Sequence, residues 1–198
     1  MDIDLHIIRG LPVAIVDNFY TEEEVDAIWN EICFLNPNLL RPEQTGGAFD
    51  EQSGDMMKQN AATFVDQVFA QPFFSNILQT NRKLFMRETL DQFIEAHYFF
   101  RYIDQTNFDT TLISRYTTND HYKPHIDAST VSALTWFCRE PKKFDGGELV
   151  IDDLEIETKN NRLVLMPGIL EHGVKPVTLN SDDTLDGRFT MTQFTMLR

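Results

Sequence analysis

Short runs rich in β-branched and aromatic residues, bounded by turn residues, recur through the C-terminal half of the chain. Such runs predict strands, and consecutive strands joined by short turns favour an antiparallel barrel or sandwich. The expected strands are VSALTWFC (131–138), ELVID (148–152), RLVLMPG (162–168) and GRFTMTQFTML (187–197). The last run alternates, so Arg188, Thr190, Thr192 and Phe194 share one face and Phe189, Met191 and Gln193 the other.

The N-terminal half has a different pattern. Residues 13–17 predict a short strand, and Thr21 followed by Glu24 forms a capping-box signature for a helix through about Phe34. Helical patterns cover residues 62–69 and 74–96, and Tyr98–Ile103 is expected to begin the strands. Residues 36–58 are rich in Pro, Gly, Asn and Gln and predict a loop, either a lid or binding loop or a plain surface loop.

Composition indicates one compact domain. The chain has 198 residues, 42% of them hydrophobic, and its 16 phenylalanines can fill a core without disulfides. Two distant cysteines, Cys33 and Cys138, predict reduced thiols in a cytosol. The N-terminus lacks a signal-like apolar segment, and no apolar run approaches a membrane span, so we expect a cytoplasmic protein without a membrane partner. A net charge of −14 disfavours a nucleic-acid partner.

Three residues on two separate segments form a candidate metal site. His125 and Asp127 stand two apart in DHYKPHID, and Pro124 favours extended backbone, which places both side chains on one face. His172 follows the predicted strand 162–168. Two histidines and one carboxylate leave positions open on an iron(II) ion for a co-substrate and O₂. The rival pair His121 and His125 has helical spacing, but Pro124 interrupts it, and we expect His121 to be solvated.

A basic residue begins the last predicted strand. Arg188 follows Asp186-Gly187, a hairpin signal, and an unpaired guanidinium is costly to bury. An arginine fork binds a carboxylate through two parallel hydrogen bonds, which suits a dicarboxylate from solution. The alternative is an arginine that is solvated or pairs with a nearby acid: Asp182, Asp183 or Asp186.

These segments together resemble the iron(II)- and 2-oxoglutarate-dependent oxygenases, in the prolyl 4-hydroxylase-like branch. YTTNDHYKPHID, FDGGELVI, PGILEHGVKPV and GRFTMTQF are similar to the branch's motif strands, and PVAIVDNFYTEEEVDAIWNEI to its opening strand, acidic turn and helix. The resemblance runs from about Val13 to the C-terminus and is strongest over residues 116–197. It implies an α+β fold, with a double-stranded β-helix (jelly-roll, cupin-like) core and N-terminal helices packed on one sheet. Residues 1–198 would form a single domain, with 1–97 as supporting elements and lid loop and 98–198 as the catalytic β core.

The resemblance also implies roles for individual residues. His125, Asp127 and His172 would hold Fe(II), Arg188 would clamp the distal carboxylate of 2-oxoglutarate, and Tyr116 would line the same pocket. Two positions depart from the usual pattern. Phe137 stands where many relatives carry a co-substrate-binding tyrosine, so Thr190 or Thr192 would supply that hydrogen bond. The long acidic stretch before Arg188 leaves Lys175 as a second candidate anchor.

The implied activity is that of a dioxygenase. It would hydroxylate an unactivated C–H bond, in a prolyl or other residue of a peptide or protein, with release of succinate and CO₂. The cofactor set would be Fe(II), 2-oxoglutarate, O₂ and ascorbate. Alternatives are a 2-oxoglutarate oxygenase acting on a small molecule, a cupin-like metalloenzyme without 2-oxoglutarate, and a non-catalytic metal-binding jelly-roll protein. An anchoring role for Arg188 would separate the 2-oxoglutarate enzymes from the rest.

Overall fold

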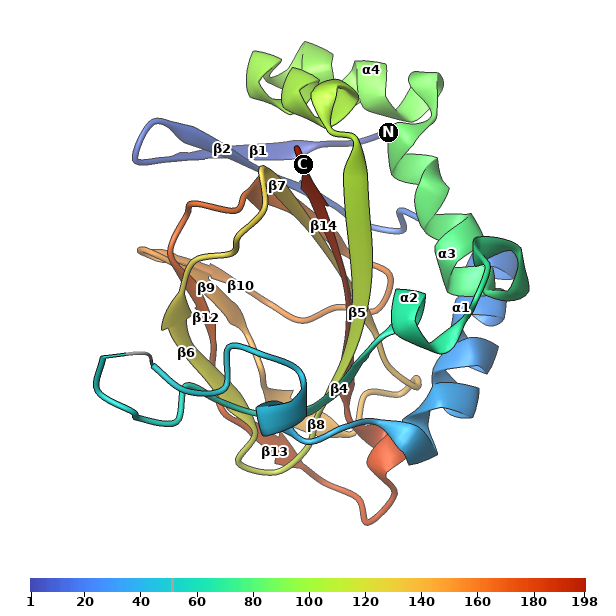
Figure 1. Ribbon diagram of the computed structural model, residues 1–198, viewed down its shortest axis with the longest axis vertical. Helices are drawn as coiled ribbons and strands as arrows, with labels where there is room; N and C mark the ends of the chain where they lie inside the picture. Colours follow the sequence, from blue (N-terminus) through green and yellow to red (C-terminus); the bar gives the residue numbers. More distant parts are fainter. Residues whose placement is uncertain (51) are drawn as a thin grey trace.

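Two antiparallel sheets face each other in the computed structural model, which describes residues 1–50 and 52–198 (Figure 1). The larger sheet has seven strands, in the order β1 (Asp4–Ile8), β2 (Leu11–Val16), β11 (Leu163–Pro167), β7 (Val131–Phe137), β14 (Arg188–Met196), β5 (Phe108–Tyr116) and β4 (Ala61–Phe64). The smaller has five, in the order β10 (Leu154–Ile156), β9 (Leu149–Ile151), β12 (His172–Val174), β6 (His121–His125) and β3 (Lys58–Gln59). A short pair, β8 (Phe144–Gly146) and β13 (Val177–Leu179), completes the strands of the described residues.

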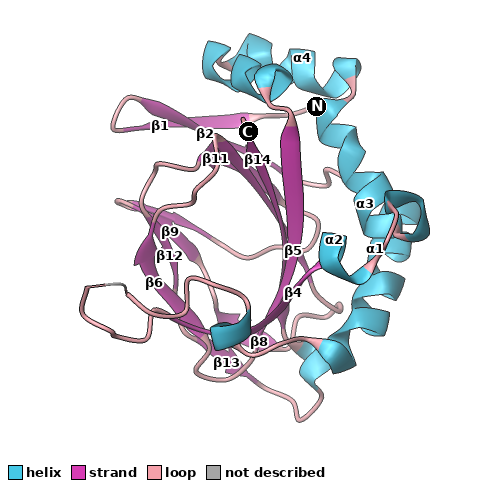
Figure 2. Cartoon of the chain, viewed as in Figure 1, coloured by secondary structure: helices cyan, strands magenta, loops and turns pink. Residues whose placement is uncertain are grey.

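Helices gather on the outer side of the seven-stranded sheet (Figure 2). They are α1 (Glu22–Leu35), α2 (Val65–Val68), α3 (Asn76–Thr80) and α4 (Arg87–Ala96). Short 3₁₀ segments join them and the strands: η1 (Asn36–Asn38), η2 (Pro42–Gln44), η3 (Pro72–Phe74), η4 (Asn81–Phe85), η5 (Tyr98–Gln105) and η6 (Thr184–Asp186). The predicted α+β class, with helices on one sheet, is therefore confirmed. Among the described residues, none of the helices has the length and apolar character needed to span a bilayer.

The two faces of the seven-stranded sheet belong to different cores. One core lies between this sheet and the helices, where Phe189 and Met191 pack with Ile28 and Ile32 of α1. The other lies between the sheets and contains Trp136. The alternation predicted for residues 187–197 is thus confirmed, because Arg188, Thr190 and Thr192 face the inside of the sandwich. The helices thus pack against the face of the sheet opposite to the one that carries Arg188, Thr190 and Thr192.

The predicted capping box of the first helix is confirmed. The Thr21 side chain accepts a hydrogen bond from the Glu24 amide, and the Glu24 carboxylate accepts one from the Thr21 amide. Most predicted strands also form, with boundaries shifted by one or two residues, including β2, β7, β9, β11 and β14.

Two predicted elements are wrong. Residues 62–69 were expected to be helical, but residues 62–64 belong to β4, which pairs with residues 112–115 of β5, and only the four-residue α2 follows. The expected strand Tyr98–Ile103 is part of η5, in which Phe100 and Ile103 are buried three residues apart. The His97 ring nitrogen Nδ1 accepts a hydrogen bond from the Phe99 amide, so His97 caps the N-terminus of η5. The helical pattern over residues 74–96 is broken into η3, α3, η4 and α4.

The Asp186-Gly187 sequence does not form a hairpin. Gly187 has an extended backbone (φ −72°) and ends η6. The strand that follows, β14, pairs with β5 and β7 across its length, whereas β13 pairs with β8. The turn therefore connects the short β8–β13 pair with β14, an inner strand of the seven-stranded sheet, and Arg188 is the first residue of that strand.

A short segment joins the two sheets on one side. Residues 58–64, which we call the strap, begin as β3 beside β6 and continue as β4 beside β5. Leu40 of the predicted loop forms an isolated bridge with Ala62 of the strap. The loop itself is largely irregular, with η1 and η2 near its start and a bridge between Phe49 and Met56; residue 51 lies outside the described residues.

Candidate active site

The structure brings together the three predicted metal ligands. His125 ends β6, His172 begins β12, and the register of these antiparallel strands places the two residues directly opposite each other. Asp127 follows two residues after His125. Its Oδ1 lies 3.7 Å from His125 Nε2, and its Oδ2 lies 3.5 Å from His172 Nε2. The candidate ligand atoms all lie within 4.8 Å of one another, which a single metal ion could bridge.

Backbone carbonyl groups orient both histidine rings. His125 Nδ1 lies 2.9 Å from the carbonyl oxygen of Lys123, and His172 Nδ1 lies 2.8 Å from that of Leu170. An N–H at Nδ1 donates in each case, so the lone pair is at Nε2 and faces Asp127. Such contacts fix the tautomer and ring orientation of metal-binding histidines. The cluster is therefore preset for coordination through Nε2.

Asp127 is held by neighbouring groups. The Ser132 hydroxyl donates to its Oδ2 at 2.6 Å, and its amide donates to the Gly168 carbonyl at 2.9 Å. A Cβ on Gly168 would come within 2.3 Å of the Ser129 carbonyl oxygen and 3.0 Å of the Asp127 carbonyl oxygen. Glycine at 168 therefore lets the Asp127 segment approach β11 closely.

The cluster is largely removed from solvent. The side chains of His125, Asp127 and His172 are 16%, 10% and 3% exposed. Burial, with a smaller contribution from His172, lowers the pKa of His125 to about 4. The imidazole is therefore neutral near pH 7, the form that binds a metal. The Tyr122 ring stacks on the His125 ring, with centroids 3.5 Å apart.

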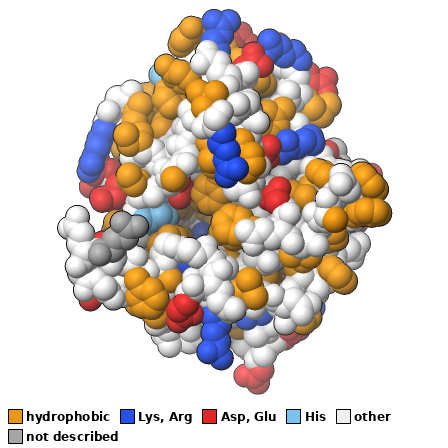
Figure 3. Space-filling view, in the orientation of Figure 1, with side chains coloured by type: hydrophobic (Ala, Val, Ile, Leu, Met, Phe, Trp, Pro, Cys, Tyr) orange, Lys and Arg blue, Asp and Glu red, His pale blue; other side chains and the backbone are white. Residues whose placement is uncertain are grey.

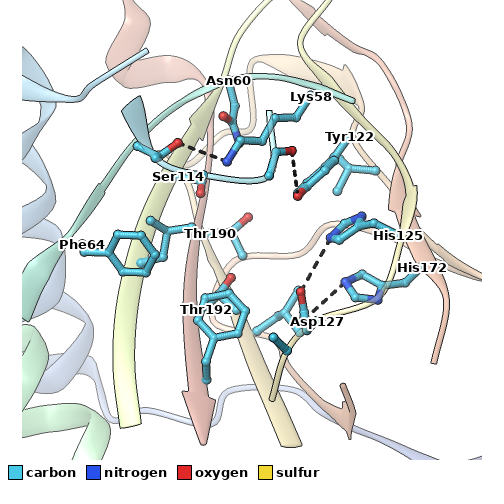
Figure 4. A pocket seen from close by; sticks show the side chains of 18 of the residues that line it. Lys58, Asn60, Phe64, Ser114, Tyr122, His125, Asp127, His172, Thr190 and Thr192 are labelled. Atoms are coloured by element: carbon cyan, nitrogen blue, oxygen red, sulfur yellow. Dashed lines mark hydrogen bonds and ion pairs between the residues drawn. The ribbon is translucent and has the colours of Figure 1, made fainter. Parts of the chain in front are cut away.

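The cluster opens into a cavity of about 350 Å³ between the two sheets. Figure 4 shows Thr190 and Thr192 facing the three metal-binding candidates across this space. On the outer surface, histidine atoms are visible at a hollow among hydrophobic side chains (Figure 3). Lining residues from the seven-stranded sheet include Phe64, Ser114, Tyr116, Leu134, Arg188, Thr190 and Thr192, and those from the five-stranded side include Lys58, Tyr122, His125 and His172.

Arg188 is fully buried in the wall of this cavity. Its Nε donates to Thr158 Oγ1 at 3.2 Å and its Nη1 to Thr190 Oγ1 at 2.6 Å, while its Nη2 has no partner in the described structure. The guanidinium lies 4.8 Å from the Tyr116 ring centroid and 5.5 Å from that of Trp136. Burial lowers the pKa of Arg188 to about 10, so it remains charged near neutral pH.

The acidic residues near Arg188 in the sequence do not neutralise it. Asp183 and Asp186 pair with Arg139 at 2.7 and 3.3 Å, and Asp186 also with Lys143. Within the described residues, no carboxylate lies within salt-bridge distance of Arg188. A buried charge without a counterion is costly, so this arrangement favours an anion that arrives from solution.

Space for the Arg188 side chain comes from Gly147. This residue has φ +76°, and a Cβ there would lie 2.6 Å from Arg188 Cδ. Thr158, which the sequence analysis did not single out, accepts from Arg188 and donates to the Gly147 carbonyl at 2.7 Å. Both residues therefore set the position of the guanidinium.

Three other residues that the sequence analysis considered, Phe137, Lys175 and His121, lie outside the cavity lining. Phe137 does not face the cavity; it is buried on the helix side of β7, 6.2 Å from the Tyr20 ring, because Leu134 and Trp136 occupy the inner face. The expectation that it replaces a co-substrate tyrosine is therefore wrong. Lys175 is an exposed residue paired with Glu155, outside the cavity. The His121 ring lies 3.0 Å from the Asn119 carbonyl oxygen, and His121 is absent from the cluster.

Lys58, Asn60 and Tyr122 are among the cavity residues that were not predicted from the sequence. Asn60 Nδ2 donates to the Tyr116 hydroxyl at 3.1 Å, while its Oδ1 has no partner in the described structure. Tyr122 stands three residues before His125, a spacing that a strand bulge converts into ring stacking. Lys58 and Asn60 carry no local signal. Lys58 contacts Thr45 in the loop and Tyr122 on β6, and the partner of Asn60, Tyr116, lies on β5.

Comparison with known proteins gives a consistent picture. The sequence profile described as "2OG-Fe(II) oxygenase superfamily" matches residues 111–196. A PKHD-type hydroxylase, YbiX, of Shigella sonnei is 33% identical over 84 residues, which are 35% of this chain and 37% of that protein. Its counterpart from Shigella dysenteriae is 27% identical over 160 residues, 72% of this chain and 71% of the relative. The first alignment thus spans little more than a third of the relative's length.

Solved structures support the fold. A prolyl-4-hydroxylase of Pseudomonas putida superposes with a TM-score of 0.57 at 17% identity, covering 94% of this chain and 92% of that one. A 2OG-Fe(II) oxygenase family oxidoreductase from Burkholderia pseudomallei gives a TM-score of 0.58 at 15% identity, covering 93% and 84%. At these identities, the similarity concerns the fold. The profile match, by contrast, contains every residue of the His/Asp/His cluster and Arg188.

Proposed function

We propose that the chain is an Fe(II)- and 2-oxoglutarate-dependent dioxygenase of the prolyl hydroxylase-like kind, because residues 111–196 match the 2OG-Fe(II) oxygenase superfamily profile and PKHD-type hydroxylases are among its relatives. It would hydroxylate an unactivated C–H bond and release succinate and CO₂. The observation that carries this proposal is the pairing, in one cavity, of the His/Asp/His cluster with a buried arginine that has a free donor.

We assign the metal to His125, Asp127 and His172. Two neutral imidazoles and one carboxylate suit iron(II), and they leave positions for other ligands. Bound there, the iron would supply the O₂ chemistry that side chains cannot perform. The protein's own part is to orient the rings through Lys123 and Leu170, to hold Asp127 through Ser132, and to keep the site dry.

We assign the distal carboxylate of 2-oxoglutarate to Arg188. Its unpaired Nη2 can donate a charge-assisted hydrogen bond, and Thr190 and Thr192 lie on the same face of β14. Tyr116 would form the side of this pocket, with its ring against the guanidinium. This arrangement favours a 2-oxoglutarate enzyme over a cupin-like metalloenzyme without that co-substrate, which has no need of a buried free arginine.

The substrate belongs to the proposal as well. PKHD-type hydroxylases and prolyl-4-hydroxylases among the similar proteins favour a prolyl or other residue of a peptide or protein. We further propose that the facing sheets form a double-stranded β-helix, that ascorbate supports turnover, and that the enzyme acts in the cytoplasm. The loop at residues 36–58 would serve as a lid, since Thr45, Gly46 and Gly47 line the cavity.

Metal and co-substrate binding test the proposal. Purified protein with Fe(II), ascorbate and a panel of proline-containing peptides should form succinate from 2-oxoglutarate. His125→Ala and Asp127→Ala should lose iron binding and turnover, because each removes a ligand. His121→Ala is the matched control, since His121 lies four residues from His125 on the same strand but outside the cluster.

Arg188→Ala should weaken 2-oxoglutarate binding by roughly ten- to a hundred-fold, as expected for a lost charge-assisted hydrogen bond, and leave iron binding nearly unchanged. Arg188→Lys should recover part of the affinity, since it keeps the charge without the fork. Wild-type-like iron affinity and turnover in both ligand variants would contradict the metal assignment. A wild type that does not bind 2-oxoglutarate would contradict the oxygenase assignment itself.

A further inference from the structure

A second buried cation lines the cavity. Lys58, on β3 of the five-stranded sheet, is only 3% exposed. Its ammonium group donates to Thr45 Oγ1 at 3.1 Å and lies 5.5 Å from the Tyr122 ring centroid. An ammonium group has three donors, so this contact leaves spare hydrogen-bonding capacity. Figure 4 shows Lys58 and Asn60 reaching into the cavity above Tyr122 and His125.

Lys58 also has no counterion among the described residues. No acidic group contributes to the pKa of Lys58, which burial lowers to about 8. The described cavity lining contains one carboxylate, Asp127, and two permanent or near-permanent cations, Lys58 and Arg188. Because the chain has a net charge of −14, the lack of an acidic partner for Lys58 is not due to a shortage of acidic residues. Burying an unpaired ammonium is costly, which indicates that the partner is a ligand.

The charges expected in the site with iron and 2-oxoglutarate bound show that, among the described cavity residues, only the charge of Lys58 lacks a partner. Iron(II) and Arg188 bring three positive charges, and Asp127 with dianionic 2-oxoglutarate brings three negative ones. The charge of Lys58, whose side chain is buried, is then left uncompensated. One further carboxylate, from a molecule other than the co-substrate, would balance it.

We infer that Lys58 binds a carboxylate of the primary substrate, and so selects substrates whose target residue is close to a free carboxylate, such as the C-terminal end of a peptide. This inference rests on the proposed oxygenase function and names its substrate class. The ammonium group donates to the substrate carboxylate. Asn60 Oδ1, which has no partner in the described structure, can accept an N–H from the same molecule.

The position of Lys58 suits a substrate group. Its ammonium lies against the Tyr122 ring, and that ring stacks on His125, so one aromatic ring separates Lys58 from the metal-binding cluster. Arg188, by contrast, extends from β14 of the opposite sheet and contacts Thr158 and Thr190. Two carboxylate sites on opposite sheets would place the co-substrate and the substrate on separate sides of the metal.

A matched pair of ligands tests the inference. Acetyl-prolyl-glycine and its C-terminal amide carry the same prolyl ring and the same glycine N–H, and they differ in the terminal charge. Their binding to the wild-type protein saturated with Mn(II) and 2-oxoglutarate is measured by calorimetry. We expect the acid to bind roughly ten- to a hundred-fold more tightly than the amide, the usual effect of a hydrogen bond to a charged group. This comparison needs no variant and therefore does not depend on the folding of one.

Variants then assign the preference to Lys58. Lys58→Met, which removes the charge and keeps most of the side-chain length, should bind acid and amide equally, while Lys58→Arg should keep part of the preference. Lys175→Met is the matched control, because it removes an exposed lysine outside the cavity. In all three variants the affinity for 2-oxoglutarate should stay within a few-fold of wild type.

Three results would overturn the inference. These are no preference for the acid in the wild type, an undiminished preference in Lys58→Met, and a loss of 2-oxoglutarate affinity in Lys58→Met as large as in Arg188→Ala. The last would place Lys58 in the co-substrate pocket. Failure of the wild type to bind 2-oxoglutarate would instead remove the proposed function, and the inference with it. The two failures are therefore distinguishable.

Discussion

Gly147→Ala is expected to displace Arg188, the proposed co-substrate anchor, without altering any group that is proposed to touch the co-substrate. Gly147 has φ +76°, and a Cβ there would lie 2.6 Å from Arg188 Cδ and 2.9 Å from Val177 Cγ2. Both distances are shorter than any stable contact between carbon atoms. Arg188 Nε and Nη1 already donate hydrogen bonds to Thr158 and Thr190. The side chain therefore cannot move aside and keep both hydrogen bonds.

The expected cost has two parts. An alanine in the left-handed region costs about 1–3 kcal/mol of folding free energy. Displacement of the guanidinium removes a charge-assisted hydrogen bond to 2-oxoglutarate, worth about 1.5–3 kcal/mol. The second part corresponds to a roughly ten- to hundred-fold rise in the dissociation constant. Metal affinity should not change, since the atoms that a Cβ on Gly147 would meet first belong to Arg188 and Val177, and to none of the three metal-binding candidates.

Gly10→Ala supplies the control. Gly10 has a similar φ of +80°, but a Cβ there would meet no atom within 4 Å. It therefore carries the backbone strain without the collision. Urea unfolding should show both variants destabilised, and 2-oxoglutarate binding in the presence of Mn(II) should be weakened only in Gly147→Ala. Equal 2-oxoglutarate affinity in the two variants would refute the argument that Gly147 makes room for a binding arginine.

Three other predictions concern the metal cluster, the strand β7 and the loop. Ser132→Ala should weaken metal binding by roughly ten- to a hundred-fold, because it frees the carboxylate of Asp127; a titration showing wild-type affinity would count against this role. Phe137→Tyr should lower the free energy of unfolding by about 1–3 kcal/mol, since it adds a hydroxyl to the helix-side core. Tighter 2-oxoglutarate binding in that variant would mean that the side chain reaches the cavity after all. Finally, hydrogen exchange in residues 39–49 should slow when Mn(II), 2-oxoglutarate and substrate bind together, and an unchanged rate would indicate a static surface loop.

The proximity of His125 and Asp127 in space could be predicted from the sequence, for a local reason. His125 and Asp127 are two residues apart on an extended segment, so strand geometry alone places them on one face. Alternation along residues 187–197 likewise placed Arg188 with Thr190 and Thr192. These predictions depend on residues that lie close to each other in the chain, or on motifs that the resemblance to the 2-oxoglutarate oxygenases had already grouped into one site.

Some predictions of secondary structure were wrong because contacts with residues distant in the sequence decide the local structure. Ala61–Phe64 has a composition that favours a helix, yet it becomes a strand because β5, some fifty residues later, offers an open edge. The aromatic run after His97 has strand-like composition, but its buried residues, Phe100 and Ile103, are three apart, as a helical turn requires. For Phe137 the information was present: Trp136 lies on the inner face, so its neighbour must face the helices.

The strap has a consequence for how such enzymes could diverge. It places Lys58, Asn60 and Phe64 in the cavity, and all three lie outside the stretch, residues 111–196, that matches the superfamily profile. The proposed ligands for iron and co-substrate all lie inside that stretch. The chain thus separates a proposed common reaction centre from a variable cavity wall formed by the strap. One side-chain contact between the two is the hydrogen bond from Asn60 of the strap to the Tyr116 hydroxyl.

Changes in the strap can therefore alter which molecules fit beside the metal while the chemistry is retained. Because β3 and β4 pair with β6 and β5 through backbone groups, their side chains can be replaced without loss of those hydrogen bonds. Relatives with the same His/Asp/His cluster and arginine but different residues on this segment would be expected to share a reaction and differ in what they hydroxylate.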